Sequence, residues 1–206
     1  MVERRANSKF FFVGNDRCID FVNSELMRGG QAVDLFESFG DLVAWLREAE
    51  ILSPAQERRA LENWGGTREG ERALQAAREL RSDLKDMLKA IVAGKSVRQS
   101  TIEKINEHLR HQSGYAVLVK TRGGFEKRLH SDFDEPSQLL APVAEAASDL
   151  LCFADPGLIK KCESESCVLY FYDTTKNHAR RWCSMSMCGN RVKVAAHYQR
   201  ARQERS

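Results

Sequence analysis

Cys162-Glu-Ser-Glu-Ser-Cys167 and, fifteen residues later, Cys183-Ser-Met-Ser-Met-Cys188 form two cysteine pairs of equal spacing near the end of the chain. Zn²⁺ prefers four soft donors in a tetrahedron, and ligand pairs separated by two to four residues are typical of structural zinc sites. A segment this short has too few apolar residues to fold alone, so metal binding would supply much of its folding free energy. The spacing predicts one structural Zn²⁺ ion bound by Cys162, Cys167, Cys183 and Cys188, with no open position for a catalytic water.

The overall composition is that of a globular protein. The chain has 206 residues, of which 42% are hydrophobic and 30% are charged. No apolar run approaches the roughly 20 residues that span a bilayer, and the start of the sequence lacks the apolar stretch of a secretory signal. We therefore expect a cytoplasmic protein without a membrane segment, in a reducing compartment where clustered cysteines favour a metal over disulfides.

Charge is distributed unevenly along the chain. The net charge is +3, yet residues 160–206 hold ten Lys and Arg against four Asp and Glu, which gives +6 there and −3 over the remainder. A basic end on a mildly acidic body suggests that the end meets an anion. A solvated basic surface is the alternative, and some of these cations would also offset the negative charge of a zinc ion with four thiolates.

The segment that follows the first cysteine pair predicts a strand over residues 168–172, a basic loop over 176–181 and a helix from about Ser186 onward. At about 100° per residue, Cys188 and Val192 face the metal. The opposite side of the helix carries Asn190, Lys193, His197 and Arg200. An α-helix fits the major groove of DNA, where Asn pairs with adenine and Arg or Lys pairs with guanine. We predict that this set contacts double-stranded DNA; a solvated helix face is the alternative.

The basic loop supplies further cations that we expect to bind phosphates: Lys176, Arg180 and Arg181. Arg191 falls nearer the cysteine side of the helix. We therefore expect Arg191 to pair inside the molecule, with Asp173 as a candidate partner.

An RNA- or protein-interaction module is the alternative function of this carboxyl-terminal segment. Recognition of single-stranded RNA favours base stacking on aromatic side chains, and the candidates are Tyr170, Tyr172 and Trp182.

A small module buries only about 600–1,000 Å² on DNA. Useful affinity therefore suggests a homodimer or an additional contact from the rest of the chain.

Residues 1–155 predict a mostly helical α+β domain. Helical patterns cover residues 17–27, 41–50, 53–65, 67–93, 100–109 and 134–153. A short strand is expected at 10–13, and residues 115–133 read as a small antiparallel hairpin. The turn Asp155-Pro-Gly157 separates this domain from residues 156–206. The expected fold class is thus α+β, with a mostly helical N-terminal domain and a small C-terminal four-cysteine zinc finger made of a strand and loop followed by a helix.

The N-terminal domain shows no pattern that supports catalysis. It has no Gly-rich phosphate loop, and its histidines are scattered without a zinc-protease spacing, so we expect no enzyme. Asp20 and Asn23 lie three residues apart, away from the apolar stripe of their helix. They would either hydrogen-bond a small ligand or tie the helix to a neighbouring loop, and polar groups beside a core more often satisfy the backbone.

The stretch Arg180-Arg-Trp-Cys-Ser-Met-Ser-Met-Cys-Gly-Asn-Arg191, together with the first cysteine pair, resembles the CGNR zinc finger, a family named after residues 188–191. In that family the four cysteines bind zinc and the module is thought to bind DNA. The stretch Gly14-Asn-Asp-Arg-Cys-Ile-Asp-Phe-Val-Asn-Ser24 resembles the opening of the ABATE domain. Arg17 and Cys18 depart from that family, which is usually apolar or small there.

The ABATE domain commonly precedes this finger in bacterial proteins described as stress-induced transcription regulators. The resemblance therefore implies a bacterial DNA-binding regulator. Its N-terminal domain would sense a small-molecule effector, form a homodimer, or do both.

Overall fold

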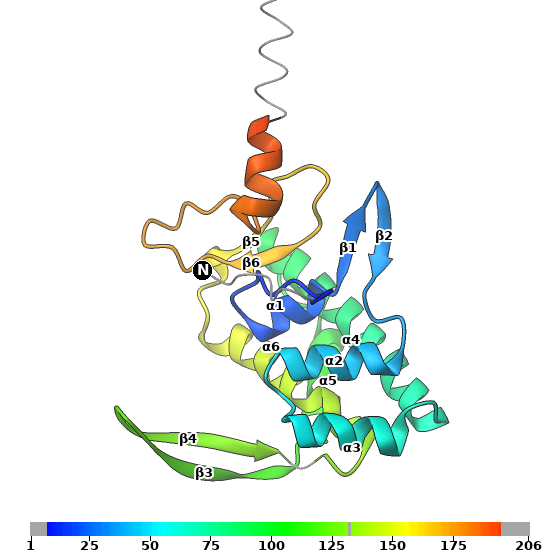
Figure 1. Ribbon diagram of the computed structural model, residues 1–206. Helices are drawn as coiled ribbons and strands as arrows, with labels where there is room; N and C mark the ends of the chain where they lie inside the picture. The colour runs from blue at the N-terminus through cyan, green and yellow to red at the C-terminus, as the bar shows by residue number, and fades with distance from the viewer. Residues whose placement is uncertain (1–7, 132, 195–206) are drawn as a thin grey trace, which may run out of the picture.

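The computed structural model describes residues 8–131 and 133–194, in which six α-helices build the body (Figure 1). These helices are α1 (Arg17–Val22), α2 (Phe39–Glu48), α3 (Pro54–Trp64), α4 (Arg68–Val92), α5 (Gln99–Leu109) and α6 (Ala141–Phe153). A short 3-10 helix, η1 (Pro136–Leu140), leads into α6, and a second one, η2 (Pro156–Leu158), follows it. No helix in these ranges is both long and apolar enough to cross a membrane.

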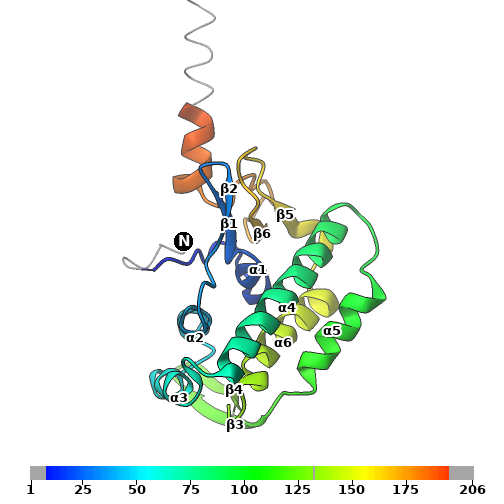
Figure 2. The same ribbon diagram turned by 90° about the vertical axis from the view of Figure 1, so that its right-hand side faces the viewer.

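The core of the body gathers around α4, which runs beside α5 and α6 in Figure 2. Thr67 caps the start of α4 through a hydrogen bond from the Gly70 backbone N–H to its hydroxyl. One face of α4 is buried along its length by Leu74, Ala77, Leu80, Leu84, Met87 and Leu88. This spacing of three and four residues is the expected apolar stripe of a helix against a core.

Other helix boundaries follow local capping chemistry, but the helix expected over residues 134–153 is α-helical only over α6, with the 3-10 helix η1 before it. Ser53 and Gln56 form a capping box ahead of α3. The helix expected over residues 100–109 begins one residue earlier as α5, with Arg98 at its N-cap and no side-chain cap. The expected strand at 10–13 is irregular backbone in the structure.

Three two-stranded antiparallel sheets complete the described fold. The first is a hairpin of β1 (Glu25–Arg28) and β2 (Gln31–Asp34), and it corrects the predicted helix over residues 17–27. That helix ends at Val22, and the side-chain amide of the next residue, Asn23, hydrogen-bonds the backbone of Tyr170. Gly29 and Gly30 then adopt φ angles of 59° and 83°, the left-handed values that a tight hairpin turn requires.

The second hairpin, β3 (Gly114–Thr121) and β4 (Gly124–Ser131), confirms the expected strand, turn and strand. It projects from the end of the molecule opposite the C-terminal segment (Figure 1). The third sheet pairs β5 (Ile159–Lys161) with β6 (Tyr170–Tyr172), which lies within the strand predicted after the first cysteine pair. A π-helical turn over Met185–Gly189 continues into an α-helix at 190–194. We call residues 185–194 the finger helix.

Candidate metal centre and nucleic-acid interface

The four predicted zinc ligands, Cys162, Cys167, Cys183 and Cys188, converge on one buried point. Their sulfur atoms all lie within 4.8 Å of one another, although the sequence spreads them over 27 residues. The Sγ atom of Cys183 is 3.8 Å from that of Cys167 and 3.5 Å from that of Cys188. A tetrahedral zinc ion with Zn–S bonds of about 2.3 Å requires S···S edges of about 3.8 Å. The sulfur cluster therefore has the size of a zinc site, and zinc is the metal that four thiolates favour.

The protonation of the cluster also fits a cation. Hydrogen bonds from Cys167 and Cys183 lower the pKa of the Cys162 thiol well below its usual range. Those same bonds to Cys162 raise the pKa of Cys167 and of Cys183, which burial raises further. The thiols on their own thus share protons, because several thiolates at this separation repel one another. A positive charge at the centre of the cluster would favour the thiolate forms of Cys162, Cys167 and Cys183 together.

Backbone hydrogen bonds hold each ligand in place. The Cys162 N–H donates to the Leu169 carbonyl, which closes the loop between the first two ligands. The Cys183 N–H donates to the Cys162 sulfur at 3.3 Å and thereby links the two pairs. The Cys188 N–H donates to the Ser184 carbonyl in the π-helical turn. The metal site therefore orients the finger helix directly.

Gly189 follows the last ligand at a point of close approach. A Cβ atom there would lie 2.6 Å from the Met185 sulfur and 3.2 Å from the Trp182 ring. Both distances are shorter than ordinary contact, so a larger residue would displace the side chains that surround the last ligand.

Arg191 pairs inside the molecule as predicted, but its partner differs from the one expected. Its guanidinium donates to the Ser164 hydroxyl at 3.2 Å and to the Cys188 sulfur at 3.3 Å. It thereby offsets the negative charge of a ligand. Asp173 is fully buried elsewhere and accepts from the Lys160 ammonium at 2.7 Å. Burial opposes ionisation of Asp173, yet the hydrogen bonds from Lys160, Thr175 and the Arg180 N–H outweigh it and lower its pKa.

Arg180, which we expected to bind phosphate, is engaged within the fold. Its Nε donates to the Trp182 carbonyl at 3.0 Å, and its Nη2 donates to the carbonyls of Val13 and Cys183. The guanidinium also lies 4.2 Å from the centre of the Phe171 ring. These contacts join the body to the finger, so we revise the assignment of Arg180 from a phosphate contact to a structural cation.

The other predicted DNA contacts in the described chain are exposed. Asn190 and Lys193 lie exposed on the finger helix, and Lys176 is exposed in the basic loop. Arg181 is exposed too, but its Nε donates to the Glu163 carboxylate at 2.6 Å. His197 and Arg200 lie outside the described residues.

The side chains of Asp20 and Asn23 hydrogen-bond backbone groups. Of the two roles considered from the sequence, this is the one that it favoured over ligand binding. Asp20 is largely buried and its carboxylate accepts from the Gly14 N–H at 2.6 Å. Burial raises the pKa of Asp20 to about 7, although the Gly14 hydrogen bond opposes this shift. The Asn23 amide donates to the Tyr170 carbonyl and accepts from the Tyr170 N–H, both at 2.9 Å. Both side chains thus hold chain segments together.

The seam between body and finger follows the edge of β6 that faces away from β5. Besides Asn23 at Tyr170, the Tyr172 N–H donates to the Gly14 carbonyl at 2.7 Å. The Asn15 amide donates to the Tyr172 carbonyl at 3.0 Å. Sequence reasoning missed Gly14 and Asn15 because their partners are more than 150 residues away and leave no local pattern.

The chain has a helical body and a four-cysteine finger, and the edge of β6 joins them. This architecture is that of a metal-binding protein with a separate helical domain. The model of the ABATE family, described as "Putative stress-induced transcription regulator", matches residues 15–153. The model of the CGNR zinc finger matches residues 159–201. The chain therefore belongs to the ABATE family and carries a CGNR zinc finger. A search of curated proteins found no match.

Proposed function

We propose that the protein is a transcription regulator that binds double-stranded DNA through its zinc finger. The observation that carries this proposal is the placement of Asn190 and Lys193. Both are exposed on a helix whose start is fixed by the last cysteine ligand. Asn can read adenine and Lys can read guanine or bind phosphate. The family description, a stress-induced transcription regulator, supports the same class of function.

The exposure of the aromatic side chains favours DNA over single-stranded RNA. Tyr170 is only 3% exposed, and Tyr172 and Trp182 are half-buried. Base stacking needs an open ring face, and the body or the finger covers much of each ring. Over residues 159–194, the finger therefore offers hydrogen-bonding and basic groups rather than a stacking platform.

A salt titration with fluorescently labelled duplex DNA tests the proposal. Phosphate binding makes affinity fall linearly with the logarithm of salt concentration. Lys193→Ala should weaken binding and reduce the magnitude of the salt slope by about one. Lys120→Ala is the matched control, since it removes the same charge from β3, far from the finger (Figure 1). Salt-independent affinity, or tighter binding to single-stranded RNA, would refute the proposal.

The role of the N-terminal domain is a separate part of the proposal. We propose that it positions the finger and that it also binds an effector or forms a homodimer. Light scattering across a concentration series measures the dimer. A monomer at all concentrations that also binds DNA would refute the homodimer.

A further inference from the structure

The β1–β2 hairpin rises toward the same end of the molecule as the finger helix. Figures 1 and 2 show this common direction from two sides. Arg28 and Met27 of β1 line a hollow of about 150 Å³ together with Met187, Cys188 and Arg191 of the finger. The hairpin therefore flanks the base of the finger helix, although 150 residues lie between Asp34 and Met185 in the sequence.

The end of this hairpin is shaped for close approach to an extended anion. Arg28 is exposed and pairs across the strands with Gln31, which is exposed and uncharged. Gly29 and Gly30 form the turn, and a Cβ atom on either would meet nothing within 4 Å. Neither glycine carries a side chain that would keep a phosphate chain away from the Arg28 guanidinium or from the turn's backbone N–H groups.

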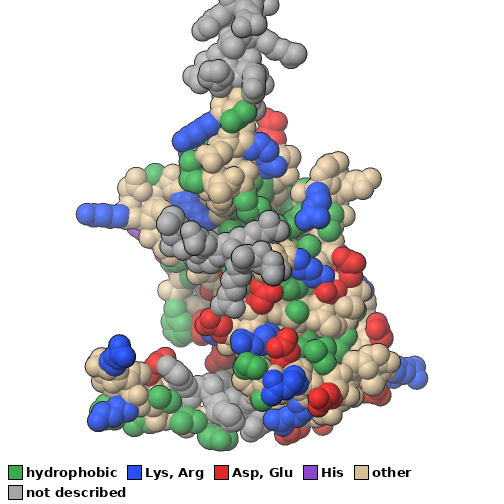
Figure 3. Space-filling model, viewed as in Figure 1, with side chains coloured by type: hydrophobic (Ala, Val, Ile, Leu, Met, Phe, Trp, Pro, Cys, Tyr) green, Lys and Arg blue, Asp and Glu red, His purple; other side chains and the backbone are tan. Residues whose placement is uncertain are grey.

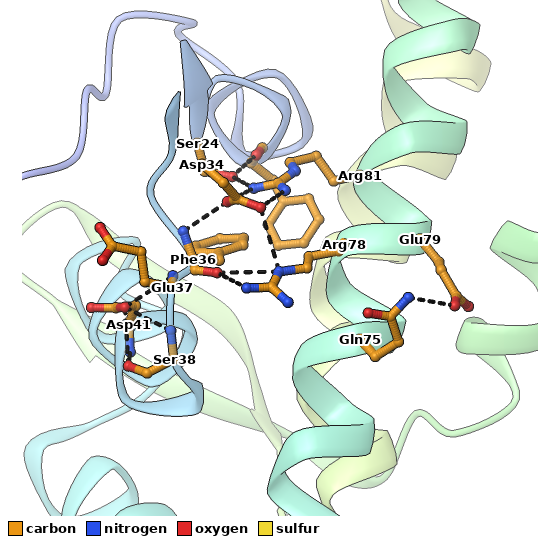
Figure 4. Close-up of polar contacts among 11 residues, drawn as sticks. Ser24, Asp34, Phe36, Glu37, Ser38, Asp41, Gln75, Arg78, Glu79 and Arg81 are labelled. Atoms are coloured by element: carbon orange, nitrogen blue, oxygen red, sulfur yellow. Dashed lines mark hydrogen bonds and ion pairs between the residues drawn. The ribbon is translucent and has the colours of Figure 1, made fainter. Parts of the chain in front are cut away.

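The base of the hairpin is fixed to the body by charged pairs on one face of α4 (Figure 4). Arg81 is nearly fully buried and donates to both carboxylate oxygens of Asp34, at 2.7 and 2.5 Å, and to the Ser24 hydroxyl. Lys85 pairs with Glu25 at the start of β1. The acidic side chains of the hairpin are thus neutralised at its base, which leaves Arg28 as the charge at its tip.

The surface at this end is basic on both elements. Figure 3 shows Lys and Arg side chains over the finger helix and over the β1–β2 hairpin on one face of the molecule. Among nearby acidic groups, Glu163 is paired with Arg181, and Glu165 is exposed. This charge pattern complements a nucleic-acid backbone.

We propose that the tip of the β1–β2 hairpin is a second DNA contact, in which Arg28 binds the phosphate backbone beside the site of the finger helix. The inference rests on the proposed DNA binding of the finger. Because α4 fixes the hairpin and the sulfur cluster with Arg180 fixes the finger, the two contacts are held in one orientation. Binding at one then places the other at high effective concentration, which compensates for the small area of a single finger.

The chain offers a matched control for this contact. The tip of β3–β4 repeats the sequence Arg-Gly-Gly as Arg122-Gly123-Gly124, on an exposed hairpin at the opposite end of the molecule. Arg28→Ala and Arg122→Ala therefore each remove an exposed arginine from the tip of a hairpin, Arg28 from the last position of its strand and Arg122 from the turn itself. Both arginines are exposed, so both variants should fold; zinc content and circular dichroism check this.

The experiment titrates wild type, Arg28→Ala, Arg122→Ala and Lys193→Ala with a mixed-sequence DNA duplex between about 50 and 200 mM salt. Arg28→Ala should weaken binding by about three- to tenfold at the low-salt end and reduce the magnitude of the salt slope by about one. Arg122→Ala should bind as wild type does. Hydroxyl-radical footprints should show a protected backbone tract that Arg28→Ala loses and Lys193→Ala retains at saturation.

The outcomes separate this inference from the function on which it rests. If Lys193→Ala weakens binding while Arg28→Ala matches wild type in affinity, slope and footprint, the hairpin contact is refuted and the finger still binds DNA. If Arg28→Ala and Arg122→Ala weaken binding equally, the effect is one of net charge and the inference is also refuted. If the affinity for DNA does not depend on salt concentration and no variant changes it, the proposed function itself is refuted.

Discussion

Replacing Asn23 with Ala should weaken the attachment of the finger to the body. Asn23 is 1% exposed, and its amide satisfies both the N–H and the C=O of Tyr170 on the open edge of β6. Ala would leave both backbone groups buried without these partners. Water cannot readily replace them, because the neighbouring side chains of Tyr170 and Phe171 are buried as well.

The size of the effect follows from the number of groups left unsatisfied. Each buried donor or acceptor that loses its partner costs about 1–3 kcal/mol. Two such groups give a predicted loss of about 2–4 kcal/mol, after partial relaxation of the strand. Asn106→Ala, on the exposed side of α5, is the control and should change stability by no more than about 0.5 kcal/mol.

Urea unfolding of the zinc-loaded protein measures this loss, with tryptophan fluorescence as one probe and zinc release as another. The finger should lose zinc at lower urea than the body unfolds, because the variant removes contacts of the seam rather than of the helical core. If Asn23→Ala unfolds within about 0.5 kcal/mol of wild type and with both probes coincident, the assignment of Asn23 as a stabilising tie across the seam is wrong.

Two further predictions concern the metal and pH. A strong chelator should unfold the finger and leave the helical signal of the body largely intact, because all four ligands follow α6 in the sequence and none lies on a helix of the body; loss of all helicity would contradict this. Burial raises the pKa of Asp20 to about 7 in the folded state, above its value of 3.8 in an exposed chain. The folded state then binds more protons than the unfolded state, so the contribution of Asp20 to stability falls as pH rises from about 4 to 7. Asp20→Asn keeps the acceptor for Gly14 and should flatten that part of the stability–pH curve; an unchanged curve would refute the assignment.

Much of the local structure could be predicted from the sequence. Capping residues and the apolar stripe gave α3 and α4 within one or two residues of their bounds, because these signals act within one or two turns of a helix. The strand, turn and strand of β3–β4 also followed from local pattern. The β1–β2 hairpin did not follow from local pattern, since Ile19, Val22 and Leu26 fit a helical period and a Gly-Gly pair can end a helix as well as turn a hairpin.

The sequence alone determined which cysteines form the metal site, because two pairs of thiols at short, equal spacings are the ligand pattern of a structural zinc ion. Tertiary structure decided which basic side chains remain free to contact DNA. Arg180 and Lys193 are both basic residues near the second cysteine pair. Arg180 donates to backbone carbonyls of the body and the finger, whereas Lys193 is exposed. Spacing along the chain encodes only neighbours within a few turns. Contacts such as Asn23 with Tyr170 or Arg28 beside the finger depend on how distant segments pack, which no local pattern records.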